Sequence, residues 1–205
     1  MVTENAELMK MARQSLEGRW WQFIKATLVY YIVLIPIQLI SLSLPITSNV
    51  ISLLVGAPLA LGFIIFSLNF TRKKEAKIVD LFQGFNNYKT VLLTYLLVLA
   101  NVILRMLLLI VPGIIAAFSY SMVFYILADN PDISPTNALK KSKEMMMGYK
   151  WKIFFLGLSF LGWALLAILT LGIGLLWLMP YIQVSTINFY EDIKDNNTIP
   201  TKGWF

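Results

Sequence analysis

Arg105 is the residue with the clearest potential for chemistry, because it is the only charged residue between positions 90 and 128. An arginine in such an apolar stretch is costly, and its guanidinium can bind a phosphate or a carboxylate through two parallel hydrogen bonds. Asn101 precedes it by one helical turn, and Tyr120 lies about as far after Pro112 as Arg105 lies before it. These three polar side chains form a candidate site for a ligand or a lipid.

A simpler role for Arg105 is also open. It lies seven residues before Pro112, which is about 10 Å along a helix from the expected outer turn. A long basic side chain at that depth can extend to the lipid phosphates and act as an anchor. The anchor and the binding site are therefore two alternatives for this residue.

Most other catalytic chemistry lacks its residues in this chain. Without cysteine and histidine there can be no disulfide, thiolate nucleophile, Cys/His zinc site or imidazole catalysis. No Asp or Glu falls inside an expected span, so neither paired carboxylates nor an ion-coupled carrier site is expected there. Asp129 and Asp132 flank Asn130-Pro131, and a helix stop and a helix cap explain them better than a metal does. We therefore expect that the protein is not an enzyme and that it binds no metal and no cofactor.

The elements that must position these residues are membrane-spanning helices. Apolar residues make up 58% of the 205 residues, charged residues make up 14%, and the mean hydropathy is +0.71. A soluble fold cannot cover that much apolar surface, and several apolar stretches reach the roughly 20 residues that cross about 30 Å of hydrocarbon. The sequence predicts an all-α polytopic membrane bundle that forms a single membrane domain over residues 1–205.

About six transmembrane helices are expected, arranged as three hairpins. The expected spans cover residues 25–44, 50–70, 90–111, 113–128, 152–171 and 172–190. The expected turns cover residues 45–49, 112–113 and 172–174. The 113–128 segment is short for a full crossing.

Two cytoplasmic amphipathic helices are expected beside the spans, at residues 4–22 and 134–147. Each carries an apolar stripe next to lysines and arginines. We expect both helices to lie flat on the inner surface of the membrane, with the stripes against lipid.

The basic residues predict the orientation in the membrane. Except for Arg105, every Lys and Arg lies in the N-terminal segment, in one of two long connections or in the C-terminal tail. By the positive-inside rule, both termini and both connections are cytoplasmic. The same clusters favour anionic phospholipid headgroups of the lipid bilayer as partners, and no nucleic acid is expected.

The hairpins follow an internal repeat. The repeat-like units cover about 4–77, 78–131 and 134–192, and a cytoplasmic tail covers 193–205. Gly113 and Gly174 each follow a lysine by 24 residues and precede a tyrosine by seven, so the second and third units share one register. In this register Leu166 corresponds to Arg105, and the arginine is a feature of one unit only.

A row of small residues gives the second span a face for close packing. The row comprises Gly56, Ala57, Ala60 and Gly62. Such a face can join helices within one chain or between two copies, and packing within the chain is the expected use.

Several motifs resemble a known family. They are Pro112-Gly113-Ile114-Ile115, Tyr125-Ile126-Leu127-Ala128-Asp129-Asn130-Pro131, Gly148-Tyr149-Lys150-Trp151 and Leu171-Gly172-Ile173-Gly174, with Pro180-Tyr181 after them. With these motifs the chain is similar to the uncharacterised bacterial family known as domain of unknown function 975. The resemblance implies a six-helix plasma-membrane protein of bacteria, without catalytic residues that could be carried over.

Two functions are compatible with the sequence. The favoured one is a non-enzymatic scaffold or accessory protein with a membrane-protein partner, in envelope, export or defence processes. The alternative is a lipid or amphiphile binder or transporter that uses the polar site at Arg105, Asn101 and Tyr120.

Overall fold

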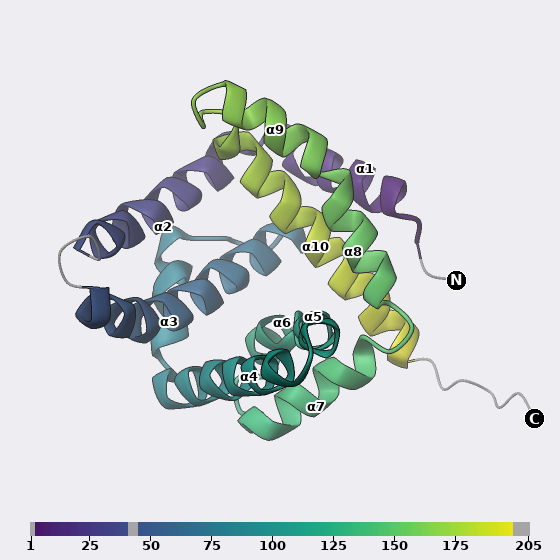
Figure 1. Cartoon of the computed structure of the whole chain (residues 1–205). Helices are drawn as coiled ribbons and strands as arrows, with labels where there is room; N and C mark the ends of the chain where they lie inside the picture. The colour runs from purple at the N-terminus through teal and green to yellow at the C-terminus, as the bar shows by residue number, and fades with distance from the viewer. Residues whose placement is uncertain (1–2, 41–44, 199–205) are drawn as a thin grey trace, which may run out of the picture.

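The computed structural model describes residues 3–40 and 45–198, and every regular element in these residues is helical. The all-α prediction is therefore confirmed. The elements are α1 (Asn5–Leu16), α2 (Trp20–Ile40), α3 (Pro45–Thr71), the 3-10 helix η1 (Ile78–Phe85), α4 (Tyr88–Leu108), α5 (Ile110–Ser119), α6 (Val123–Asp129), α7 (Pro135–Met145), α8 (Lys150–Ser159), α9 (Leu161–Leu169) and α10 (Leu175–Thr198). Figure 1 shows α2 with α3, α4 with α5 and α6, and α8 and α9 with α10 as the three hairpins.

Within the described ranges, five helical stretches are long and apolar enough to cross a membrane. They are Trp20–Leu39, Ile51–Thr71, Tyr88–Leu108, Ile110–Asp129 and Lys150–Leu169. The sixth expected span, 172–190, is not among them. Its helix α10 contains Gln183 and Asn188 and ends in a charged stretch, which lowers its hydropathy. α10 also continues to Thr198 into the expected tail, and residues 199–205 lie outside the described part.

Two of the three expected turns are displaced. α3 begins at Pro45, so residues 45–49 are helical and the connection before them falls at 41–44, outside the described residues. The second turn lies at Leu109, which is extended with φ −160° and ψ 141°. Pro112 can therefore enter the first turn of α5, where its missing N–H costs no helical hydrogen bond. The return segment Ile110–Asp129 is 20 residues long. It is therefore longer than the expected 113–128 segment and long enough for a full crossing.

The amphipathic helices α1 and α7 are present, but protein covers their apolar stripes. Leu8, Ala12 and Leu16 of α1 are fully buried, and so are Ala138 of α7 and Met146, which directly follows α7. α1 packs along α10, while α7 packs against α4 and α6. The expectation that the stripes face lipid is wrong, because other helices of the same chain supply the apolar surface.

α1 runs antiparallel to the second half of α10, although the two helices lie far apart in the sequence. The Thr3 hydroxyl donates to Asp192 Oδ1 at 2.9 Å, and Asn188 Nδ2 donates to the Leu8 carbonyl at 3.2 Å. Lys152 at the start of α8 pairs with the Asp192 carboxylate at 3.1 Å. The start of α1 and the end of α10 therefore lie on the same side of the molecule (Figure 1).

Two glycines let η1 lie backbone to backbone on α3. A side chain at Gly62 would collide with the Leu81 carbonyl, and a side chain at Gly84 would collide with the Pro58 carbonyl. Close packing within the chain is thus confirmed for the small-residue face at Gly62, and its partner is η1.

Gly113 and Gly174 occupy matching places in the second and third hairpins. A Cβ atom at Gly113 would lie 2.9 Å from Met106 Cα, and a Cβ atom at Gly174 would lie 2.9 Å from Ala167 Cα. The contacted residue is seven positions earlier in both hairpins. This geometry agrees with the shared register of the two units, while the unit boundaries stay a prediction.

Candidate functional site

The structure brings the three residues of the predicted site together between α4 and the end of α5. Tyr120 Oη donates to Asn101 Oδ1 at 3.5 Å, and the guanidinium carbon of Arg105 lies 5.6 Å from the centre of the Tyr120 ring. Asn101 Nδ2 donates to the Leu97 carbonyl at 2.8 Å, so its oxygen is left to accept from the tyrosine. A cation, an amide and a phenol thus meet inside one hairpin.

The surroundings of this site are apolar and open. Tyr120 is nearly buried and Arg105 is half-buried. The next residues toward the turn, from Leu107 to Val111, are 65–79% exposed. Arg105 therefore presents its charge beside a rim that suits contact with acyl chains.

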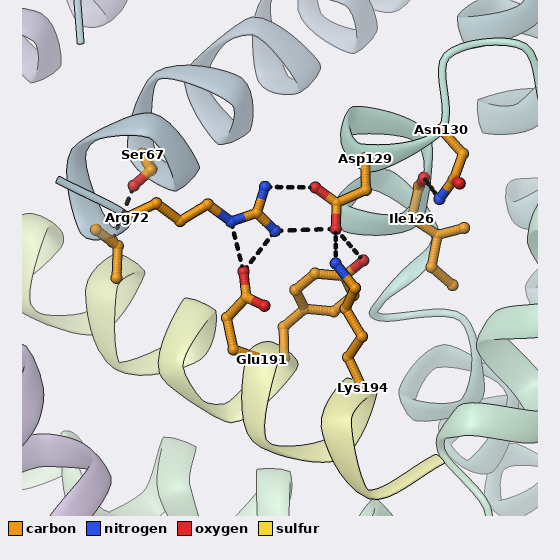
Figure 2. Close-up of polar contacts among 9 residues, drawn as sticks. Ser67, Arg72, Ile126, Asp129, Asn130, Glu191 and Lys194 are labelled. Atoms are coloured by element: carbon orange, nitrogen blue, oxygen red, sulfur yellow. Dashed lines mark hydrogen bonds and ion pairs between the residues drawn. The ribbon is translucent and has the colours of Figure 1, made fainter. Parts of the chain in front are cut away.

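A second polar site joins the ends of three helices. We call it the Arg72 cluster. It comprises Arg72, Asp129, Glu191 and Lys194, which Figure 2 labels, together with Tyr190. Arg72 Nη1 and Nη2 donate to the two carboxylate oxygens of Asp129 at 2.7 and 2.9 Å, and Arg72 Nε donates to Glu191 Oε1 at 2.7 Å. Tyr190 Oη donates to Asp129 Oδ2 at 2.9 Å, and Lys194 pairs with the same oxygen.

The local sequence places each member of the cluster. Arg72 directly follows Thr71, the last residue of α3. Asp129 is the last residue of α6 because Asn130-Pro131 cannot continue the helix. The three members on α10 lie within five consecutive positions, and Lys194 follows Glu191 by three positions and Tyr190 by four, so that it lies next to both on the helix surface. Each of the three hairpins contributes the end of its return helix.

The cluster balances its charges and is largely shielded from water. Two carboxylates face two cations, and the side chains of Asp129 and Arg72 are 8% and 26% exposed. Hydrogen bonding to Asp129 raises the pKa of Arg72 above its ordinary value, burial opposes that rise, and Glu191 adds to it. Because the two-pronged guanidinium–carboxylate contact is charge-assisted, it is stronger than a contact between neutral groups.

Asp129 is more than the helix stop that the sequence predicts. Its two oxygens already accept from Arg72, Tyr190 and Lys194, which leaves little room for a cation. Asp132 is exposed, and Ser134 caps α7 by accepting from the Asn137 N–H at 3.4 Å. In the part of the chain that the structure describes, no group of three or more Asp, Glu, His or Cys residues is placed to hold a metal.

The Arg72 cluster is absent from the sequence predictions because each of its charges has a local explanation. Arg72 belongs to the basic group that sets topology, Asp129 ends a helix, and Glu191 follows an expected span. The available signal is positional. An arginine follows the first return helix, an aspartate ends the second, and a glutamate and a lysine lie in the last part of the third.

A family model described as "Protein of unknown function (DUF975)" matches residues 95–197 of the chain. The match covers half of the chain and includes the Arg105 site and every member of the Arg72 cluster except Arg72. The family resemblance that the motifs indicate is thus confirmed. No curated protein and no solved structure matches the chain.

Proposed function

Because the chain belongs to the DUF975 family of unknown function, we propose its role from its own residues: it is a multi-pass protein of the bacterial plasma membrane that acts as a non-enzymatic scaffold or accessory protein. Its membrane-protein partner belongs to an envelope, export or defence process. The five membrane-length helices support a multi-pass protein. Both termini are cytoplasmic, which is in line with the Thr3–Asp192 contact and with the positions of the basic residues.

The Arg72 cluster is the observation that carries the scaffold proposal. It joins one helix end from each hairpin through charge-assisted hydrogen bonds. Carriers that alternate between two open states rock one bundle of helices against another. A shielded clamp across all three hairpins opposes such movement, so it suits a frame that holds a partner in place.

The test is capture of that partner from native membranes. Wild-type protein, cross-linked in the membrane and purified, should recover one membrane protein at a fixed ratio. Arg72→Gln should lower the recovery at equal membrane abundance, because loosened hairpins no longer present one continuous surface. Lys77→Gln is the matched control, since Lys77 pairs with Glu75 where both side chains are exposed. Failure of the wild type to retain any stoichiometric partner would contradict the scaffold.

A second candidate function is binding of a lipid or amphiphile at the Arg105 site. The observation that favours it is the meeting of Arg105, Asn101 and Tyr120. A planar guanidinium next to an aromatic ring and an amide is suited to an anionic headgroup, which it binds through two hydrogen bonds. Its test is the comparison of lysine and leucine at position 105, which is described below.

A further inference from the structure

A cavity of about 360 Å³ lies between α1, α2, α9 and α10. Figure 1 shows these elements meeting at one corner, where the start of α10 passes the start of α2. The walls are almost entirely aromatic and aliphatic, and they include Trp20, Trp163, Trp177, Tyr181 and Leu166. The volume falls in the range of about 300–1,000 Å³ that is typical of pockets for small ligands.

The repeat register explains why this hollow exists. The alignment that pairs Gly174 with Gly113 also pairs Tyr181 with Tyr120 and Leu166 with Arg105. In the second unit the long Arg105 side chain lies beside its tyrosine. The third unit has the shorter Leu166 there, and the equivalent space is open.

In the third unit, where Leu166 stands in the place of Arg105, the cation comes from α1, outside the hairpin. Arg13 of α1 lines the cavity together with Tyr181. Among the ion pairs between described residues, none includes Arg13. The other basic residue of α1, Lys10, is paired with Glu7. Within the described part of the chain, Arg13 is thus a cation without a paired carboxylate beside an apolar cavity.

This combination selects the chemistry of the occupant. Indole and leucine walls offer an acyl chain van der Waals contact, but they offer few partners to a polar molecule. The guanidinium at the rim favours a phosphate, which it can hold with two hydrogen bonds. Tryptophan side chains are also enriched at the depth where lipid headgroups meet acyl chains.

We propose that this cavity binds an anionic phospholipid of the surrounding bilayer. The part of one acyl chain next to the headgroup occupies the space beside Leu166 and the three tryptophans, and the phosphate lies on Arg13. The site is separate from the Arg105 site and does not depend on the scaffold function.

Quenching of tryptophan fluorescence by brominated lipid tests the proposal. Trp21, Trp151 and Trp204 are first replaced by phenylalanine, so that the emission comes from Trp20, Trp163 and Trp177. The protein is placed in vesicles that carry a small fraction of phosphatidylglycerol or phosphatidylcholine with brominated acyl chains. Brominated phosphatidylglycerol should quench at about a tenfold lower mole fraction. Both lipids carry the phosphate, but phosphatidylcholine also carries a choline cation, which is repelled by Arg13 and competes with it for the phosphate.

Two pairs of variants locate the effect. Arg13→Gln should abolish the preference for phosphatidylglycerol, whereas Lys10→Gln, in the same helix, should retain it. Leu166→Phe should reduce quenching by filling the cavity, and Leu165→Phe should not, since Leu165 is exposed and does not line it. Circular dichroism and the elution volume in detergent confirm that each variant is folded.

Three results would overturn the proposal. Equal quenching by the two brominated lipids shows that the cavity has no preference for an anionic headgroup. An unchanged preference in folded Arg13→Gln removes the arginine from the site. Unchanged quenching in folded Leu166→Phe shows that the acyl chain lies elsewhere.

Discussion

Arg105 illustrates how one substitution can separate two physical roles of the same side chain. An anchor needs only a long stem with a cation, and lysine provides both. A site for phosphate needs the planar fork of the guanidinium, which lysine lacks. Since Arg105 already lies over Tyr120 beside Asn101, these two side chains hold the guanidinium in a defined position for binding a phosphate.

We expect Arg105→Lys and Arg105→Leu to lose retained anionic lipid to a similar degree. Leucine should not impair insertion, because replacing the charge makes the span more favourable by roughly 3 kcal/mol on translocon scales. The measurement is the phospholipid retained by purified protein, at equal membrane abundance of each variant. If both variants retain lipid like the wild type, Arg105 is an interfacial anchor and the second candidate function fails.

The Arg72 cluster predicts a strong stability effect from a single residue. Arg72→Gln leaves Asp129 shielded and short of its main partner, so we expect a loss of roughly 2–4 kcal/mol, the upper end being typical of broken buried pairs. Thermal unfolding in detergent reports the change. The double variant Arg72→Gln/Asp129→Asn should be less destabilised than the sum of the two single variants, because it removes both charges. Additive effects would show that the two side chains are not coupled.

At the scale of elements, the backbone contact of η1 with α3 gives a matched pair of glycines. Gly62→Ala should destabilise the fold strongly, because the new Cβ would collide with the Leu81 carbonyl, which cannot move away as a side chain can. Gly56→Ala, in the same helix, should be neutral or slightly stabilising, since nothing lies within 4 Å of its Cβ position. Comparable melting temperatures for the two variants would mean that η1 does not rest on α3 in this way.

The elements themselves could largely be predicted from the sequence, whereas their partners could not. Helical periodicity predicts α1 and α7, and Ser134 as a cap predicts where α7 starts. The long apolar stretches predict most of the spans. A stripe such as Leu8, Ala12 and Leu16 states only that something apolar must cover it. Lipid and α10 satisfy that condition equally, so only the tertiary structure distinguishes them.

The candidate sites differ in the same respect. The Arg105 site could be predicted because its residues lie within one hairpin, where helical periodicity and a single turn fix their separation. The Arg72 cluster joins three hairpins across 123 positions, from Arg72 to Lys194, with no motif that spans them. Its charges become informative only when the helix ends are placed together.

At the scale of the whole molecule, the cavity bears on how the chain crosses the membrane. Arg13 and Trp20, expected at the inner surface, line one cavity with Gly174 of the turn expected outside and with Thr170, which lies just before that turn. A cavity of about 360 Å³ is too small to reach across roughly 30 Å of hydrocarbon. With the start of α1 and the end of α10 on one side, we infer that the first two hairpins cross and that the third lies along the membrane.

Single cysteines can test this arrangement, because the chain has no cysteine of its own. We expect Val111→Cys, at the exposed turn of the second hairpin, to react with a membrane-impermeant thiol reagent added outside the cell. Thr170→Cys should not react from outside. Gln14→Cys on α1 should react only after the membrane is opened. Outside labelling of Thr170→Cys would show that the third hairpin crosses the bilayer.

The pairing of α1 with α10 also has a consequence for biosynthesis. Asn188 contacts Leu8 across 180 positions of sequence, so the partner of α1 leaves the ribosome long after α1 does. Until then the apolar stripe of α1 has no protein to cover it, and the nearest apolar surface is the membrane interface. The amphipathic pattern of α1 thus suits the membrane interface during translation, and its buried stripe reflects its packing on α10 in the finished fold. A chain released before α10 is made would keep its N-terminus on the lipid, open to proteases that the finished fold excludes.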